Sequence, residues 1–228
     1  MRFARLGKPP RVARSGNRIE RRLRFDNEVV NVGTGPLEVY PVSADCDRDG
    51  DVRNDRLAMQ RIFVDDGDGV FNRARDTQSH SQPTDCMIFH PQHRHWHIEN
   101  FARYELKRSS DGTIVASSAK VSFCIIDIHH RRPALPGSPA TKHYTQCDRA
   151  STLGISVGWS DEYHSTLADQ YIVLPPGVGD GTYCLLSTVD PSGYFVELNA
   201  DKLNNVAGVQ ISISGGLVVN RNPTLRCR

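Results

Sequence analysis

Residues 87–101 have the sequence MIFHPQHRHWHIENF, in which three histidines alternate with other residues. The flanking residues are mostly apolar, β-branched or aromatic, which predicts a β-strand here and not a helix. In a strand, residues at positions i, i+2 and i+4 lie on one face. We therefore expect His93, His95 and His97 to share a face, with the two intervening side chains on the other.

These three imidazoles indicate a metal site, because neutral imidazole is a ligand for zinc, copper, iron and nickel. A straight strand would separate the outer pair by about 13 Å, so one ion held by all three requires a twist or a bulge. Glu99 follows closely, as in a cupin-like site, but the glycines that frame a cupin motif are missing. The alternative is that the histidines are surface or hydrogen-bonded residues without a metal.

Short alternating or apolar runs dominate the rest of the chain, separated by clusters of Gly, Pro, Asn and Asp. This pattern predicts an all-β fold similar to a β-sandwich, with long loops. Besides the strand around the histidines, the expected strands lie at 22–31, 37–42, 61–64, 101–106, 113–115, 119–128, 170–174, 183–189 and 208–213. Asp111-Gly112 predicts a hairpin turn. Residues 129–169 are expected to form a long functional loop region.

The chain has 228 residues, enough for one domain with a sizeable core. We expect an arginine-rich lead-in at 1–21 and the domain at 22–228. The formal net charge of +2 says little about partners. The lead-in is suited to an acidic surface, but Phe3 and Phe25 are its only nearby aromatic residues, so we expect no nucleic-acid partner. No apolar run is long enough to span a membrane.

Six cysteines are scattered along the chain without a CxxC pair. An even, dispersed set fits three disulfides in an oxidising compartment, and the alternative is a set of buried thiols in a cytosolic protein. The simplest arrangement is sequential, Cys46–Cys86, Cys124–Cys147 and Cys184–Cys227, although sequence alone does not fix the connectivity. The first residues lack an apolar signal-peptide core. We therefore expect a secreted protein whose start lies upstream or whose signal has been removed.

Two acidic stretches interrupt the first half. Within residues 45–55, Asp47, Asp49 and Asp51 alternate with other residues beside a glycine, as in the first half of a calcium loop. The glutamate that would close an EF-hand is missing at the expected offset. We expect a calcium site or a solvated acidic loop there, and a turn at the shorter stretch 65–69.

Downstream of the histidines come Lys120-Val121-Ser122-Phe123-Cys124 and Asp161-Glu162-Tyr163. In this order the motifs resemble the catalytic domain of the lysyl oxidase family, over roughly residues 23–213. The resemblance implies a secreted copper amine oxidase acting on primary amines, with peptidyl lysine as one candidate. Such an enzyme uses molecular oxygen and releases an aldehyde, ammonia and hydrogen peroxide.

Carried over residue by residue, the resemblance implies copper ligands at His93, His95 and His97. It also implies a lysine tyrosylquinone cofactor that joins Lys120 to Tyr163, and a proton-abstracting base at Asp161. A buried site favours the neutral lysine amine that this crosslink requires. His90 matches a histidine of the family pattern to which we assign no ligand role.

The chain departs from the animal enzymes at several positions. Gln92 stands where they have a cysteine just before the copper histidines, and Trp159 and residues 169–170 lack the cysteines expected near the quinone tyrosine. The family's C-terminal calcium ligands match Asp201, Asn204 and Asn205, with Asn199 where the animal enzymes have glutamate. Losing that charge would weaken calcium binding, and the alternative is an ordinary Asn-rich turn.

Two functions therefore compete. One is the copper- and quinone-dependent amine oxidase, and the other is a secreted copper-binding β-sandwich without turnover. The presence of both Lys120 and Tyr163 favours the enzyme, because a protein that only holds copper does not need that pair.

Overall fold

The computed structural model describes residues 12–15, 18–46, 55–118, 122–197 and 203–222. Within these ranges the regular structure is β-strand, apart from the short 3₁₀ helix η1 (Leu203–Asn205). Over the same ranges, no helix is both long and apolar enough to cross a membrane. The prediction of an all-β fold is confirmed.

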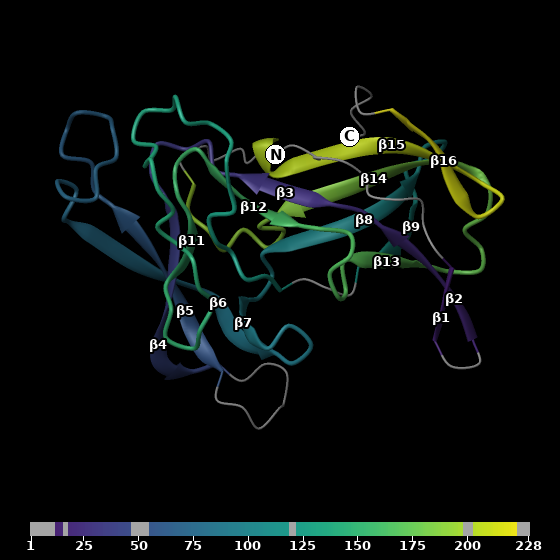
Figure 1. Cartoon of the computed structure of the whole chain (residues 1–228), viewed down its shortest axis with the longest axis horizontal. Helices are drawn as coiled ribbons and strands as arrows, with labels where there is room; N and C mark the ends of the chain where they lie inside the picture. The colour runs from purple at the N-terminus through teal and green to yellow at the C-terminus, as the bar shows by residue number, and fades with distance from the viewer. Residues whose placement is uncertain (1–11, 16–17, 47–54, 119–121, 198–202, 223–228) are drawn as a thin grey trace.

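The strands of the described residues form four sheets (Figure 1). The first five-stranded sheet runs, in spatial order, β11 (Leu153–Ile155), β4 (Leu37–Asp45), β5 (Arg56–Phe63), β6 (Ser79–His90) and β7 (His95–Ile98). The second runs β16 (Leu217–Asn222), β15 (Val206–Ser214), β14 (Gly181–Val189), β8 (Ala102–Arg108) and β9 (Ile114–Ser117).

Two three-stranded sheets complete the fold. One is β1 (Val12–Ser15), β2 (Arg18–Arg24) and β13 (Tyr171–Leu174). The other is β10 (His129–His130), β12 (Trp159–Tyr163) and β3 (Asn27–Val30). In the view of Figure 1, β3 and β12 cross the centre of the molecule between β7 and the β14–β15 pair. The described part of the predicted lead-in thus includes strand residues that pair within the first of these small sheets.

Alternation along the strands builds the core. In β8, Ala102 and Tyr104 are fully buried while Arg103 between them is exposed. Leu106 lies opposite Leu185 of β14. The apolar cluster that these residues form also contains buried residues of the first sheet, such as Met87. Full burial of each such side chain contributes about 1.5–3 kcal/mol, so this shared core holds the sheets together.

Several sequence expectations need correction. The expected strand at 22–31 is interrupted at Phe25 and Asp26, because β2 pairs with β13 whereas β3 pairs with β12. The expected strand at 119–128 is irregular where it is described, apart from a bridge at Phe123. The expected loop region 129–169 contains β10, β11 and β12.

Other expectations hold. Asp111 and Gly112 lie in the β8–β9 hairpin, where Gly112 has a φ of 72° that favours glycine. The stretch 65–69 is a turn, in which Asp65 Oδ1 accepts hydrogen bonds from the backbone N–H groups of Gly67 and Gly69.

The disulfides Cys46–Cys86 and Cys124–Cys147 are formed as predicted, and no described cysteine is free. The predicted pair Cys184–Cys227 includes a residue outside the described ranges.

Candidate metal centre and catalytic residues

The four clustered histidines lie on the hairpin formed by β6 and β7. In its antiparallel register His90 pairs with His95, and Ile88 pairs with His97, so these side chains share a face. The other face carries Phe89 and Trp96, whose rings meet edge to face at 5.9 Å. The hairpin therefore separates an imidazole face from an aromatic face.

The expectation that His93 extends the same strand was wrong. Strand β7 begins at His95, and His93 lies in the connecting turn. Arg94 closes that turn with a positive φ of 62°, and its backbone N–H donates to the carbonyl of His90 at 2.8 Å. The turn supplies the bend that one metal ion would need, since the His93 and His97 ring centroids are only 5.1 Å apart.

The ring nitrogens of three of these histidines, His90, His93 and His97, lie within 4.8 Å of one another. The ring of His95 is 4.9 Å from that of His97 and 5.6 Å from that of His93, measured between centroids. Four imidazoles in one cluster form the nitrogen-rich donor set that suits copper or zinc. The residues present therefore fit the metal that the sequence resemblance implies.

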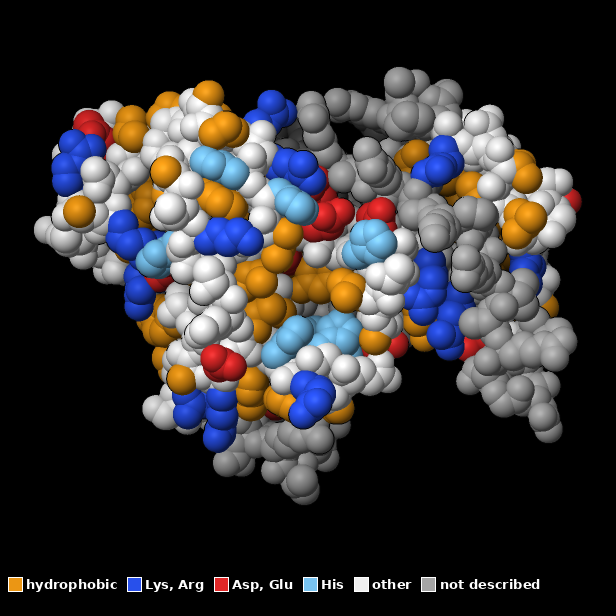
Figure 2. Space-filling model, viewed as in Figure 1, with side chains coloured by type: hydrophobic (Ala, Val, Ile, Leu, Met, Phe, Trp, Pro, Cys, Tyr) orange, Lys and Arg blue, Asp and Glu red, His pale blue; other side chains and the backbone are white. Residues whose placement is uncertain are grey.

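The histidines of the cluster differ in how deeply they are buried. His97 is fully buried, whereas His90, His93 and His95 are partly exposed. Figure 2 shows a patch of histidine side chains near the middle of this face, next to hydrophobic side chains, with other histidines scattered separately. An ion held here would contact protein on its inner side and remain open to small molecules on its outer side.

A short segment after the expected quinone lysine packs against the hairpin. Ser122 Oγ lies 3.2 Å from Nδ1 of His97. Phe123 and Ile98 exchange backbone hydrogen bonds of 2.8 and 2.9 Å. The disulfide of Cys124 leads to Cys147, whose carbonyl accepts the backbone N–H of Trp96 at 2.8 Å. Residues 122–124 are thus fixed beside the histidines.

The same segment contacts Tyr163. The rings of Phe123 and Tyr163 meet edge to face at 4.6 Å, and the Tyr163 hydroxyl donates to the Cys124 carbonyl at 2.5 Å. The structure therefore joins the histidine hairpin to Tyr163 through residues 122–124. Lys120, the other member of the predicted crosslink, lies outside the described ranges.

Asp161 and Tyr163 lie two positions apart on β12, so both project to the same face, and both are buried. Burial, the negative charge of Asp161 and the neighbouring Tyr104 raise the pKa of the Tyr163 phenol well above its ordinary value. The phenol is therefore neutral at physiological pH. Asp161 thus supplies a carboxylate near this ring, and its role as a base stays a prediction.

The loop that follows Tyr163 returns to the histidine turn. The Ala168 carbonyl lies 3.1 Å from Nε2 of His93, and Asp169 Oδ2 lies 3.8 Å from Nε2 of His90. With its amide group turned so that the NH₂ faces the carboxylate, Gln92 also donates to Asp169. Gln92 and Asp169 both lie at positions where the animal enzymes are expected to have cysteines, and here a hydrogen bond connects the two.

Arg24 of β2 holds the loop that follows Tyr163 in place. Its Nη1 donates to the carbonyls of Ser165 and Leu167 at 2.8 and 3.0 Å. The spacing of His90 to His93 was a visible signal for the histidine cluster. No local pattern marked Arg24 or Asp169, because their role depends on which segments meet in space.

The predicted calcium sites are only partly covered by the described residues. Asp47, Asp49, Asp51 and Asp201 lie outside these ranges. Asn205 is buried and donates to Glu197 Oε1 at 2.6 Å, whereas Asn204 is exposed. Glu197 is a carboxylate that the sequence comparison with the animal enzymes did not suggest. Calcium binding at both places stays a prediction.

Comparison with known proteins places the chain in a family. A family model for lysyl oxidase matches residues 42–222. The chain is 26% identical to lysyl oxidase homolog 4 of Homo sapiens over 147 residues, which cover 64% of this chain and 18% of that protein. It is 34% identical to lysyl oxidase homolog 2A of Danio rerio over 122 residues, covering 53% and 15% respectively.

The matched part therefore spans less than a fifth of the length of these two relatives. The family match nevertheless covers most of this chain, and it includes the histidine hairpin, residues 122–124 and Tyr163. On this evidence the chain belongs to the lysyl oxidase family.

Proposed function

We propose that this protein is a copper-dependent amine oxidase. In the overall reaction, a primary amine, molecular oxygen and water give an aldehyde, ammonia and hydrogen peroxide. The amine loses two electrons and oxygen gains them. The observation that carries the proposal is the physical link from the histidine cluster through residues 122–124 to Tyr163.

The hairpin would hold the copper. His93, His95 and His97 are the ligands that the family resemblance implies, and the geometry adds His90 as a fourth imidazole within reach. Ser122 next to His97 and Asp169 next to His90 are partners that would orient the ligand rings. Such contacts fix the ring orientation and tautomer of metal-bound histidine.

When present, copper would supply one-electron chemistry with oxygen, and a quinone made from Tyr163 and Lys120 would supply an electrophilic carbonyl for the amine. The chain itself positions the ring. Phe123 packs against one side of Tyr163, and the Cys124 carbonyl fixes its hydroxyl. Because Tyr163 is only 5% exposed, bulk water is largely kept from the ring.

Asp161 is the proposed base. It would take the proton from the carbon next to the amine nitrogen, and hold that proton on a carboxylate oxygen. A positioned base of this kind typically accelerates proton transfer by about 10²–10⁴-fold. Asp161 is buried on the same strand face as Tyr163, so the distance between the two is set by the β12 backbone.

Peroxide release tests the proposal. Copper-loaded protein is assayed with simple alkyl amines and with a lysine-rich protein, and activity with either one is expected. Tyr163→Phe should bind copper and release no peroxide, and Asp161→Asn should keep copper but lose at least about a hundredfold in rate. Tyr183→Phe, on β14 and with its hydroxyl donating to the Gly179 carbonyl, is the matched control and should stay active.

Full activity in Tyr163→Phe would exclude a quinone built on that ring. Stoichiometric copper without peroxide from any amine would instead support a copper-binding protein without turnover. Two formed disulfides favour an oxidising compartment for either function, and we propose that the protein acts outside the cytosol.

A further inference from the structure

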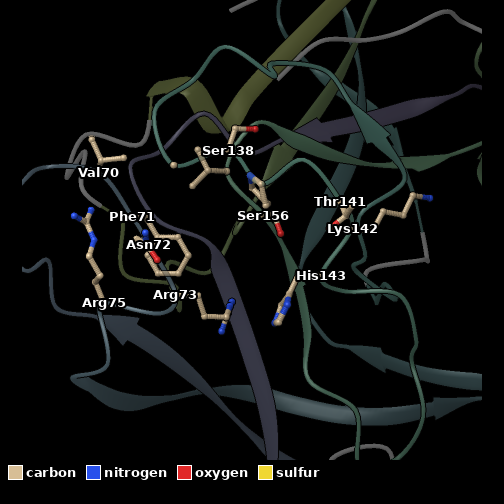
Figure 3. Close-up of a pocket in the computed structure, with 13 residues that line it drawn as sticks. Val70, Phe71, Asn72, Arg73, Arg75, Ser138, Thr141, Lys142, His143 and Ser156 are labelled. Carbon is tan, nitrogen blue, oxygen red and sulfur yellow. The ribbon is translucent and has the colours of Figure 1, made fainter.

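A cavity of about 460 Å³ lies between loop 70–75 and loop 137–143 (Figure 3). Its volume falls within the range of about 300–1,000 Å³ that is common for small-molecule sites. None of the hairpin histidines lines it, and neither does Asp161 or Tyr163. It is therefore distinct from the proposed oxidase site.

The lining has an apolar and a polar part. Phe71, Pro139 and Val157 contribute apolar surface, and Arg73 and His143 contribute nitrogen groups. Figure 3 shows the Arg73 guanidinium and the His143 ring on the same side of the cavity, below the Ser156 hydroxyl. No aspartate or glutamate is among the lining residues. The lining itself therefore presents N–H groups and positive charge, and the carboxylate that pairs with Arg73, Glu38, is not one of the lining residues.

Arg73 is held in place before any ligand arrives. Its Nη2 donates to Glu38 Oε2 at 2.8 Å and to the Tyr144 hydroxyl at 2.7 Å. Its guanidinium also lies 5.0 Å from the Phe63 ring centroid. Among the described residues these two hydrogen bonds use only Nη2, so Nε and Nη1 keep N–H groups for a ligand. A pre-positioned guanidinium binds carboxylate or phosphate with little further loss of entropy.

One buried carboxylate, that of Asp127, holds His143 and Ser156 of the lining in place. Asp127 Oδ2 accepts hydrogen bonds from the backbone N–H of His143 at 2.9 Å and from the Ser156 hydroxyl at 2.8 Å. Its Oδ1 accepts the backbone N–H of Ser156 at 2.8 Å. The His143 ring packs edge to face on Tyr144 at 4.7 Å. The polar part of the cavity is thus built by residues that are already tied to the core.

We propose that this cavity binds a small organic anion, with a carboxylate or phosphate group between Arg73 and His143 and an apolar body against Phe71 and Pro139. The inference is independent of amine oxidation, since no residue of the proposed oxidase site takes part. Carboxylate and phosphate share the chemistry of a planar or tetrahedral oxyanion that accepts several N–H bonds.

Calorimetric titration of the full-length protein with benzoate and with phenyl phosphate tests the proposal and separates the two anion types. Benzyl alcohol has the same ring without the charge and should bind at least about tenfold more weakly. His143→Asp places a negative charge at an exposed position and should weaken anion binding by about tenfold or more, which is about 1.4 kcal/mol. Arg73→Lys keeps the charge beside Glu38 but loses the planar fork, and should weaken binding as well.

Lys142→Gln is the matched control. Lys142 lines the cavity, but Figure 3 shows its side chain directed away from Arg73 and His143. Removing its charge should therefore change the affinity by less than about twofold. His97→Ala should also leave anion binding intact.

A second readout follows the His143 ring by NMR. In the free protein, partial burial of the ring and then the charge of Arg73 lower the His143 pKa, against the opposing charges of Glu38 and Asp127. A bound anion should raise it. Equal binding of benzyl alcohol, unchanged binding in His143→Asp and Arg73→Lys, or loss of binding in His97→Ala would each overturn the proposal, as would no binding of either anion.

Discussion

Nδ1 of His97 lies 3.2 Å from the Ser122 hydroxyl, and this contact joins the deepest histidine of the cluster to the segment that holds Tyr163. A metal ligand and a redox-active ring must lie close together if one is to help oxidise the other. Here the two are separated by a single short segment, residues 122–124.

Replacing the buried histidine should remove the metal. His97→Ala deletes the imidazole at the centre of the cluster, so the dialysed protein should contain little copper by elemental analysis. The geometry favours His90 as a ligand, whereas the family resemblance implies His95. His90→Ala and His95→Ala test these two rings separately, and the variant that loses more copper identifies the stronger ligand. The exposed His80 on β6 is a matched control, and His80→Ala should retain copper. Copper retained by all three cluster variants would place the metal elsewhere.

Removing the Ser122 hydroxyl should weaken copper binding without unfolding the protein. Ser122→Ala leaves His97 without the oxygen beside Nδ1, and loss of such a partner typically lowers metal affinity by about 10–100-fold. Competition with a chelator measures the change. Ser122→Thr restores a hydroxyl and should recover most of the affinity. If Ser122→Ala bound copper as tightly as the native chain, the contact would have no part in the site.

Breaking the Cys124–Cys147 bond should destabilise the protein. The bond closes a loop with a sequence separation of 23, for which the chain-entropy model predicts about 3 kcal/mol of the free energy of unfolding. Urea denaturation of the Cys124→Ser, Cys147→Ser double variant should show this loss. Thiol titration of the unreduced native protein in denaturant should find almost no free thiol. Free thiols in the active protein would argue against an oxidising compartment.

High pH should destabilise the fold through its buried tyrosines. Burial raises the pKa of Tyr104, Tyr144 and Tyr163 above the ordinary value of about 10. The unfolded chain then loses these protons first, so the stabilising contribution is complete below pH 10 and declines as pH rises above it. Chemical denaturation at pH 8 and pH 11 measures the slope, which Tyr163→Phe should reduce. An identical slope in that variant would show that Tyr163 ionises normally.

The sequence was informative where one short segment carried the signal. The strand expected at 101–106 corresponds to β8, and Asp111-Gly112 predicted the turn after it. The spacing of the histidines indicated a metal site, and it also indicated that the strand must bend if one ion is to contact all three rings. Sequential pairing anticipated both described disulfides.

The sequence was uninformative where the local structure depends on segments that lie far away along the chain. Residues 122–128 have the composition of a strand, yet their backbone hydrogen bonds go to several different segments, so they form no continuous ladder with one neighbour. The turn position of His93 depends on the left-handed Arg94, which no propensity favours. Arg24 and Asp169 lie beside the site because β2 pairs with β13, which cannot be read from either segment alone.

The most direct test of the quinone mechanism is mass spectrometry of the copper-loaded, reduced and alkylated protein after trypsin digestion. A crosslinked Lys120 resists cleavage, so peptide 109–131 should appear joined to peptide 150–202, which contains Tyr163. The joined species should be absent from Tyr163→Phe and from protein purified without copper. Complete recovery of a separate, unmodified peptide 109–120 from protein that still releases peroxide would contradict the account.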